Sequence, residues 1–341
     1  MENTISYGEK AYDLNLGEKG KIRDIQFDQK SRRYAGILYA LPPTGNYRWR
    51  KPRPLPPSYT YANGEDGPFD ATQFKAICPQ KAFHVGKAEG GDGTYSEDCL
   101  FMNIWTPFGD EKNSKWPVML WLHGVWFQMG DPSQDPGMDP TELISTNGLN
   151  AIIVAIGYRL NIFGFLAGEA LLEESQGDSA GNFGLWDQRM AAEWVKQNVS
   201  LFGGDPNNIT LAGRSAGAYS VESQMLYEFR KPGPKTSLYR HSCTAKVTSG
   251  SQALVTTQDL VEAIPKLEHH TFRPVTDHLF IHPNMMEYLS SPDFAHEFKS
   301  RGYKILIGEV ANEETLYSVY NSPTEPSLDA LRMQVVNYYS P

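Results

Sequence analysis

Residues 209–226 decide the fold, and they read ITLAGRSAGAYSVESQML. The segment opens with a short apolar run, 209–212, of the kind that forms a buried strand. It continues into a stretch, 218–226, whose composition favours a helix. Between the two lies Gly-x-Ser-x-Gly, with Ser215 at its centre. In this context the pentapeptide predicts a sharp strand-to-helix turn that exposes the serine hydroxyl at a helix N-terminus, where the dipole favours a developing anion.

Apolar runs elsewhere in the chain predict the rest of a sheet. Continuous runs occur at 117–122, 151–156 and 304–307, and such runs are typical of strands buried on both faces of a parallel sheet. A helix is expected at 184–198, where apolar residues recur on one helical face. This alternation of strand and helix predicts an α/β fold with a doubly wound, mostly parallel central sheet.

The N-terminal part of the chain has a different pattern. Residues 21–50 alternate polar and apolar side chains and end in Pro-Pro-Thr-Gly, which predicts antiparallel hairpin strands. Residues 51–98 are rich in Pro, Gly and Asp and are expected to form surface loops. A short strand is expected at 101–105, whereas 255–300 has no pattern that assigns it.

The composition excludes several classes of protein. The chain has 341 residues, a net charge of −9 and 12% aromatic residues, so a sizeable core is expected rather than disorder. An acidic balance without clusters of Lys or Arg argues against binding of nucleic acid. No apolar run approaches the roughly 20 residues of a membrane span. No apolar signal region is visible at residues 1–13, so a cytoplasmic location is expected. The sequence does not predict the oligomeric state.

Several motifs, in order, resemble the type-B carboxylesterase and cholinesterase family of α/β-hydrolases. One stretch resembles the family's serine signature and consists of Phe202-Gly203-Gly204 followed by 209–217. A second stretch, Glu97-Asp98-Cys99-Leu100 with 103–107, resembles another family signature, although Phe101 and Met102 depart from it. Further matches lie within 36–49, 158–165 and 181–188. The resemblance covers 30–255 densely and 270–320 loosely.

This resemblance implies an α/β-hydrolase fold over residues 1–341, as one domain with antiparallel N-terminal hairpins. It implies a small-molecule carboxylic ester as the substrate, and neither a cofactor nor a metal. Ser215 is expected to be the nucleophile that forms an acyl-enzyme. The backbone N–H groups of Val125, Trp126 and Ala216 are expected to form the oxyanion hole.

The oxyanion segment, 123–127, departs from the family because Val125 and Trp126 replace two glycines. Both residues keep a backbone N–H, since only proline lacks one. Their side chains are expected to narrow the site, and valine disfavours a positive φ. The alternative is a hydrophobic loop that packs without donating hydrogen bonds.

The resemblance places the acid that orients the general base at Glu313, which follows the strand and glycine at 304–308. The catalytic histidine is unknown. All eight histidines precede Glu313, whereas the family's histidine lies well downstream of the acid. His123 matches a structural histidine of the oxyanion loop. We therefore expect that the chain is incomplete at its C-terminal end and lacks the last strand or strands and the base.

Cys78 and Cys99 match the family's first disulfide. Two free thiols are the alternative, because no signal sequence is visible. The loop between the two cysteines contains no Trp, so a cation–π site for choline is not supported there.

Two kinds of function follow from these features. The first is a serine hydrolase that acts on neutral carboxylic esters through Ser215, and that is inactive as this chain if no base is present. The alternative is a catalytically dead binding protein on the hydrolase fold, or a truncated gene product. We expect the hydrolase on the strength of the motifs.

Overall fold

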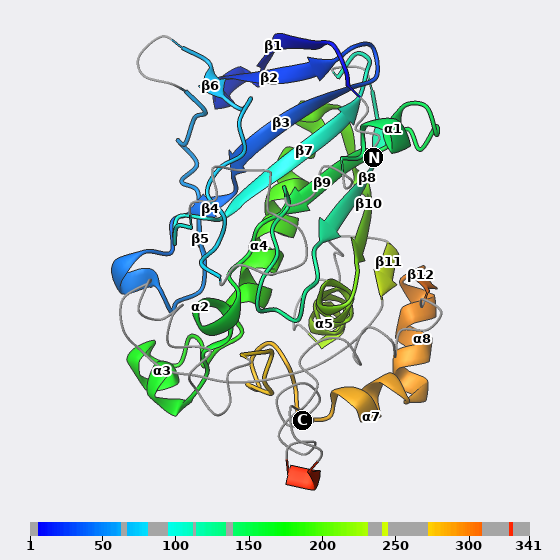
Figure 1. The fold of residues 1–341 in the computed structure, drawn as a ribbon. Helices are drawn as coiled ribbons and strands as arrows, with labels where there is room; N and C mark the ends of the chain where they lie inside the picture. The colour runs from blue at the N-terminus through cyan, green and yellow to red at the C-terminus, as the bar shows by residue number, and fades with distance from the viewer. Residues whose placement is uncertain are drawn as a thin grey trace.

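The computed structural model describes residues 6–62, 67–80, 95–111, 114–133, 139–230, 241–244, 272–308 and 327–329. A large sheet runs through the middle of these residues, and helices pack on it (Figure 1). The strands are β1 (Glu9–Asn15), β2 (Lys21–Phe27), β3 (Ser31–Leu38), β4 (Ala40–Leu41), β5 (Arg53–Pro54), β6 (Phe69–Asp70), β7 (Phe101–Pro107), β8 (Trp116–Leu122), β9 (Ile152–Ile156), β10 (Gly204–Gly213), β11 (His241–Thr244) and β12 (Lys304–Ile307).

The large sheet has the strand order β1-β2-β3-β7-β9-β8-β10-β11-β12, and β6 pairs with β2. From β9 through β8, β10 and β11 to β12 the neighbours are parallel. From β1 through β2, β3 and β7 to β9 the neighbours are antiparallel. β4 and β5 form a separate two-stranded sheet. The continuous apolar runs in the sequence therefore correspond to the parallel strands of the sheet. The alternating N-terminal pattern corresponds to antiparallel strands.

Helices pack on the sheet and on one another. They are α1 (Thr141–Ile144), α2 (Asn161–Phe165), α3 (Glu169–Glu174), α4 (Phe183–Asn198), α5 (Ala216–Arg230), α7 (Met285–Leu289) and α8 (Pro292–Ser300), with 3₁₀ turns at Gly17–Lys19, Gly45–Tyr47 and Val199–Phe202. α4 and α5 lie against the parallel part of the sheet, since α5 contacts β8, β10 and β11, and α4 contacts both β10 and α5. The expected helix at 184–198 corresponds to α4, which begins one residue earlier.

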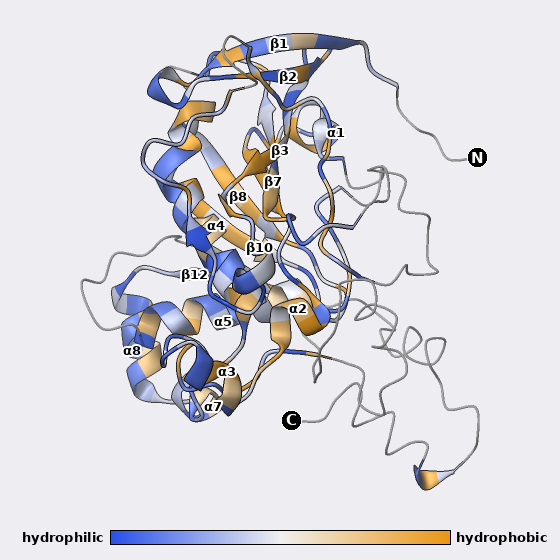
Figure 2. Ribbon diagram, turned by 90° about the vertical axis from the view of Figure 1, so that its left-hand side faces the viewer, coloured by the Kyte–Doolittle hydropathy of each residue, from blue (hydrophilic) through white to orange (hydrophobic). Residues whose placement is uncertain are grey.

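The two faces of the sheet bury different clusters of apolar side chains. Ile104 and Val154 belong to the main core, which also includes the apolar faces of α4 and α5. Their neighbours Trp105 and Ile153 point the other way and form a smaller cluster with Ile144 of α1. Successive residues of a strand face opposite sides, so both clusters are built from the same strands. Figure 2 shows orange, hydrophobic residues along both β7 and β8, as expected for strands in the interior.

One expectation about burial was wrong. The sequence predicts that residues 304–307 are buried on both faces, but all four residues of β12 are exposed, and Leu306 has 73% of its surface accessible. The reason is the position of the strand. Among the described residues β12 is the edge of the sheet and pairs with β11 alone. By contrast, β9 lies between two strands and is buried along its whole length.

Charged residues within the sequence motifs form ion pairs that hold loops together. Arg159 donates to both carboxylate oxygens of Asp187, at 2.6 and 2.8 Å, and both side chains are almost fully buried. Arg159 also donates to the carbonyl oxygens of Arg48 and Arg50. The Arg48 side chain in turn pairs with Glu97 at 2.5 Å. These motif residues therefore stabilise the scaffold around the N-terminal end of α4.

A buried acid lies within the N-terminal hairpin of β1 and β2. Asp24 of β2 has no exposed surface. Burial raises the pKa of Asp24 to about 7, although the Tyr34 hydroxyl and the Arg32 charge act in the opposite direction. Asp13 on the neighbouring strand is exposed and pairs with Arg23 at 2.6 Å.

Candidate active site

Ser215 lies in the turn between the end of β10 and the start of α5. Its φ is +58°, in the left-handed region that non-glycine residues seldom adopt. The turn leads directly into the helix, because the Gly217 N–H donates to the Arg214 carbonyl and the Ala218 N–H donates to the Ser215 carbonyl, both at 2.9 Å. The predicted nucleophile elbow is present, with a half-buried Ser215 side chain.

Two glycines let other backbone approach this turn. A Cβ atom at Gly124 would lie 2.5 Å from the Arg214 carbonyl oxygen and 3.1 Å from the Ser215 Cβ. A Cβ atom at Gly217 would overlap the carbonyl oxygen of Leu122, the last residue of β8. Both positions exclude any side chain. The loop that follows β8 is therefore packed against the Ser215 turn.

This loop, residues 123–130, has an unusual backbone. Val125, Trp126 and Phe127 are consecutive non-glycine residues with φ of +69°, +55° and +61°. The left-handed conformation costs roughly 1–2 kcal/mol per residue, so the surrounding contacts must hold it. Val125 adopts a positive φ although valine disfavours it. The loop backbone therefore has the left-handed conformation that glycines at these positions would adopt without strain.

Two backbone N–H groups near Ser215 come from different segments of the chain, the loop after β8 and the start of α5. Ala216 is the first residue of α5, and the first N–H groups of a helix have no partner within the helix. Among the described residues, the N–H groups of Val125 and Ala216 have no backbone acceptor. Two such donors beside a serine hydroxyl are suited to stabilise an oxyanion.

Packing and hydrogen bonds hold the loop from behind. The Phe127 ring is buried and contacts Phe165 and Tyr219, with ring centroids 4.9 and 5.9 Å apart. The Asn161 N–H donates to the Phe127 carbonyl at 2.7 Å, and the Asn161 side-chain amide donates to the Gln128 carbonyl at 3.1 Å. The left-handed stretch is thus fixed at its C-terminal end.

His123 supports the other end of the loop. Its ring stacks on Tyr158 with centroids 4.3 Å apart, and the Tyr158 hydroxyl donates to the His123 carbonyl at 2.8 Å. The ring nitrogen Nδ1 lies 3.2 Å from the Gly124 carbonyl oxygen, an arrangement that requires the proton on Nδ1. Burial lowers the pKa of His123 to about 4. His123 is therefore a neutral structural residue.

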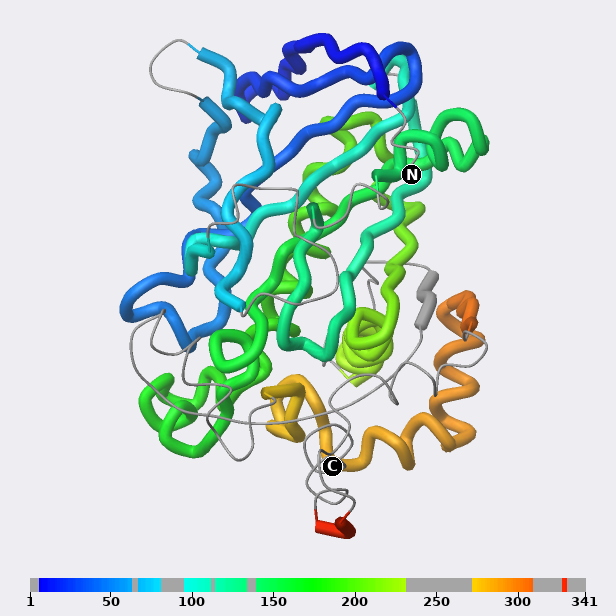
Figure 3. Tube along the Cα trace, viewed as in Figure 1, coloured from blue at the N-terminus to red at the C-terminus, as the bar shows by residue number. Residues whose placement is uncertain are grey.

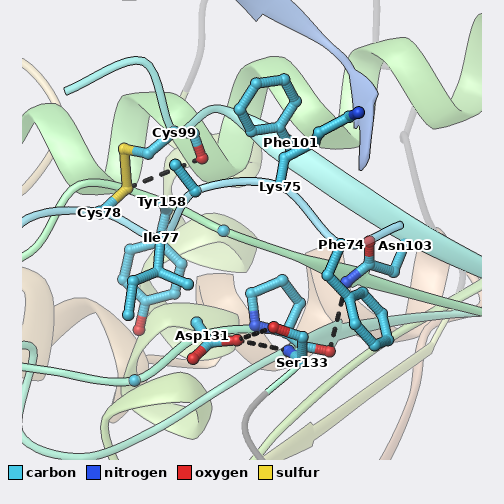
Figure 4. A pocket seen from close by; sticks show the side chains of 14 residues that line it. Phe74, Lys75, Ile77, Cys78, Cys99, Phe101, Asn103, Asp131, Ser133 and Tyr158 are labelled. Carbon is cyan, nitrogen blue, oxygen red and sulfur yellow. Dashed lines mark hydrogen bonds between the residues drawn. A yellow bond between two sulfur atoms is a disulfide. The ribbon is translucent and has the colours of Figure 1, made fainter. Parts of the chain in front are cut away.

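A small pocket with a volume of about 10 Å³, partly open to solvent, is lined in part by Tyr158. The disulfide between Cys78 and Cys99 forms part of its wall, together with Asp131 and Ser133 (Figure 4). Ser133 is held in place because its N–H donates to an Asp131 carboxylate oxygen at 2.6 Å. Ser215 does not line this cavity, so it is distinct from the site at the elbow.

The structure brings together some of the predicted site residues. Ser215, Val125, Trp126 and Ala216 lie at the elbow and the adjoining loop. Glu313 lies outside the described residues, and so do His84, His269 and His270. Within the described part of the chain, His278 and His296 are exposed. No cluster of His, Cys, Asp or Glu in that part could hold a metal.

Two supporting residues were missed by the sequence analysis. Gln128 and Asn161 hold the loop 123–130 through hydrogen bonds between side chain and backbone. Such bonds have no sequence period. The only sequence features that could have pointed to these two residues are their positions: Gln128 directly follows the predicted loop, and Asn161 begins the helix α2.

Comparison with known proteins identifies the chain. Residues 13–242 match the carboxylesterase family, which is more than half of the sequence. The chain belongs to the carboxylesterase family. An uncharacterized esterase/lipase of Schizosaccharomyces pombe is 36% identical over 99% of this chain and 68% of its own length. A carboxylic ester hydrolase of Gibberella moniliformis is 34% identical over 98% of this chain and 68% of its own length.

A solved carboxylesterase structure supports the fold. The carboxylesterase Est55 of Geobacillus stearothermophilus has a TM-score of 0.68 and 28% identity, and the match covers 96% of this chain and 68% of that one. The expected α/β-hydrolase fold is confirmed. Within the described residues of this carboxylesterase-family chain, no helix has the length and apolar character needed to cross a membrane.

Proposed function

We propose that this member of the carboxylesterase family cleaves carboxylic esters with Ser215 as nucleophile, and that the N–H groups of Val125, Trp126 and Ala216 form its oxyanion hole. The observation that carries the proposal is the packing of Gly124 against Ser215. This contact brings the loop after β8 to the serine at the start of α5. A serine without such donors would be an ordinary turn residue.

The reaction follows from this arrangement. The Ser215 hydroxyl oxygen adds to the ester carbonyl carbon while its proton passes to a general base. The carbonyl oxygen becomes an oxyanion and accepts hydrogen bonds from the backbone N–H groups. When the tetrahedral intermediate collapses, the alcohol leaves with a proton and Ser215 carries the acyl group. Water then adds to the acyl-enzyme, and the carboxylic acid is released.

His123 is unsuited to be the general base. Its Nδ1 is bonded to the Gly124 carbonyl, its side chain is buried, and its lowered pKa makes it a weak proton acceptor at neutral pH. The proposal keeps Glu313 as the acid that orients a base. Its support is the position of Glu313 after β12, in the register that the family resemblance implies.

A fluorophosphonate probe tests the proposal, because it labels only an activated serine. We expect the purified full chain to be labelled at Ser215, with labelling lost in S215A and kept in S300A, a change on the outer helix α8. Mass spectrometry locates the label. A cooperatively melting chain that takes no label at Ser215 would refute the proposal and favour a binding protein on the same fold.

A further inference from the structure

Two side-chain amides hold the segment 272–275, which is remote in sequence from the elbow. The Asn182 side chain donates to the Val275 carbonyl at 2.8 Å and accepts from the Val275 N–H at 2.9 Å. The Gln128 side chain likewise donates to the Phe272 carbonyl and accepts from the Phe272 N–H at 3.3 Å. Each amide thus pairs with both polar groups of one backbone residue.

Gln128 makes one further bond that Asn182 lacks. Its Nε2 also donates to the carbonyl oxygen of Trp126 at 3.1 Å, within the left-handed stretch. The side chain therefore ties the oxyanion loop to segment 272–275. Figure 3 shows this meeting of distant parts of the chain, where the teal-green trace of the loop lies beside the yellow-orange trace that begins at residue 272.

The backbone of Gln128 acts on the same loop. Its N–H donates to the Val125 carbonyl at 3.1 Å. That carbonyl shares a planar trans peptide with the N–H of Trp126, so the two groups point in opposite directions. A hydrogen bond that fixes the Val125 carbonyl therefore also fixes the direction of the Trp126 N–H. His123 has the same effect on the preceding peptide, because its bond to the Gly124 carbonyl orients the N–H of Val125.

We propose that Gln128 is a positioning residue of the oxyanion loop. Its main chain orients the peptide that carries the Trp126 N–H, and its side chain fixes the next peptide to segment 272–275. Three consecutive left-handed residues do not keep their conformation by local preference. Glycines would adopt this left-handed conformation without strain. In this chain the hydrogen bonds of Gln128 stabilise it instead. The catalytic consequence rests on the proposed function, whereas the structural consequence does not.

Hydrogen–deuterium exchange of the full chain tests the structural part without any need for activity. The matched variants are Q128E and N182D, because each replaces an amide donor by a carboxylate at a bond to segment 272–275. We expect faster exchange in residues 272–276 in both variants. In residues 124–129, Q128E should exchange about ten-fold faster, as expected for the loss of the partly buried hydrogen bond to the Trp126 carbonyl, while N182D should match wild type.

Equal exchange of residues 124–129 in Q128E and N182D would overturn the proposal, and so would wild-type exchange in Q128E. If Q128E does not fold, Q128A removes both donor bonds and the bond accepted from the Phe272 N–H without adding a charge, and N182A becomes its matched control. Ester hydrolysis provides the second readout. Q128E should lower kcat about ten-fold with KM unchanged, and N182D should change neither. If wild type hydrolyses no ester, the proposed function fails while the exchange comparison still decides the role of Gln128.

Discussion

The buried Asp24 carboxyl is expected to make the stability of the protein depend on pH. Its pKa is raised from 3.8 to about 7 by burial, so the folded state keeps a proton between pH 4 and 7 that the unfolded state releases. Where the folded state binds more protons, the free energy of unfolding falls as pH rises. The stabilisation is complete below pH 3.8 and is lost as pH rises through 7.

The magnitude follows from the difference in pKa. About 3 units at 1.36 kcal/mol per unit give about 4 kcal/mol in total. Integrating the same linkage between pH 5 and pH 8 gives a loss of about 2.5 kcal/mol over that interval. The substitution D24N removes the ionisation, so it should remove this part of the pH dependence whatever its effect on absolute stability.

Urea unfolding at pH 5, 6, 7 and 8 measures the effect as a difference in slope between wild type and D24N. D13N is the matched control, since Asp13 lies on the neighbouring strand, is exposed, and has a pKa lowered by its hydrogen bond with Arg23. D13N should keep the wild-type slope over this range. If D24N also keeps it, Asp24 does not hold its proton in the folded state and the reasoning is refuted.

Two further changes test the scaffold. The disulfide between Cys78 and Cys99 closes a loop of sequence separation 21, so replacing both cysteines by serine should lower the free energy of unfolding by about 3 kcal/mol; an unchanged urea midpoint would contradict this. D187A leaves the buried Arg159 without its carboxylate and should cost about 3–5 kcal/mol. D178A, which removes an exposed ion-pair partner, should cost under about 1 kcal/mol by the same measurement.

The sequence predicts the inner strands well because burial on both faces needs apolar residues at every position. β8, β9 and β10 and the helix α4 lie where the apolar patterns indicate. β12 has the same kind of run and is nevertheless exposed. Its place at the edge depends on which strands lie beside it, and that is a property of the whole sheet. The four residues of β12 do not reveal whether the strand lies at the edge of the sheet or in its interior.

The candidate site also has one part that the sequence predicts and one part that it does not. The elbow at Ser215 could be predicted because strand, turn and helix are contiguous in the chain. The conformation of the oxyanion loop could not, since valine at position 125 argues against the positive φ that it adopts. The contacts that hold it come from Asn161 and from the segment beginning at Phe272. Hydrogen bonds across more than a hundred residues leave no local pattern.

The close approach of backbone around Ser215 limits how this site can diverge during evolution. Gly124 and Gly217 each face a carbonyl oxygen where even a methyl group would overlap, so replacing either one requires the loop and the elbow to move apart together. The side chain of Arg214, the residue before Ser215, is exposed and has no such restriction. A lineage that acquires a new substrate preference at this site would therefore change position 214 readily, and the glycines almost never.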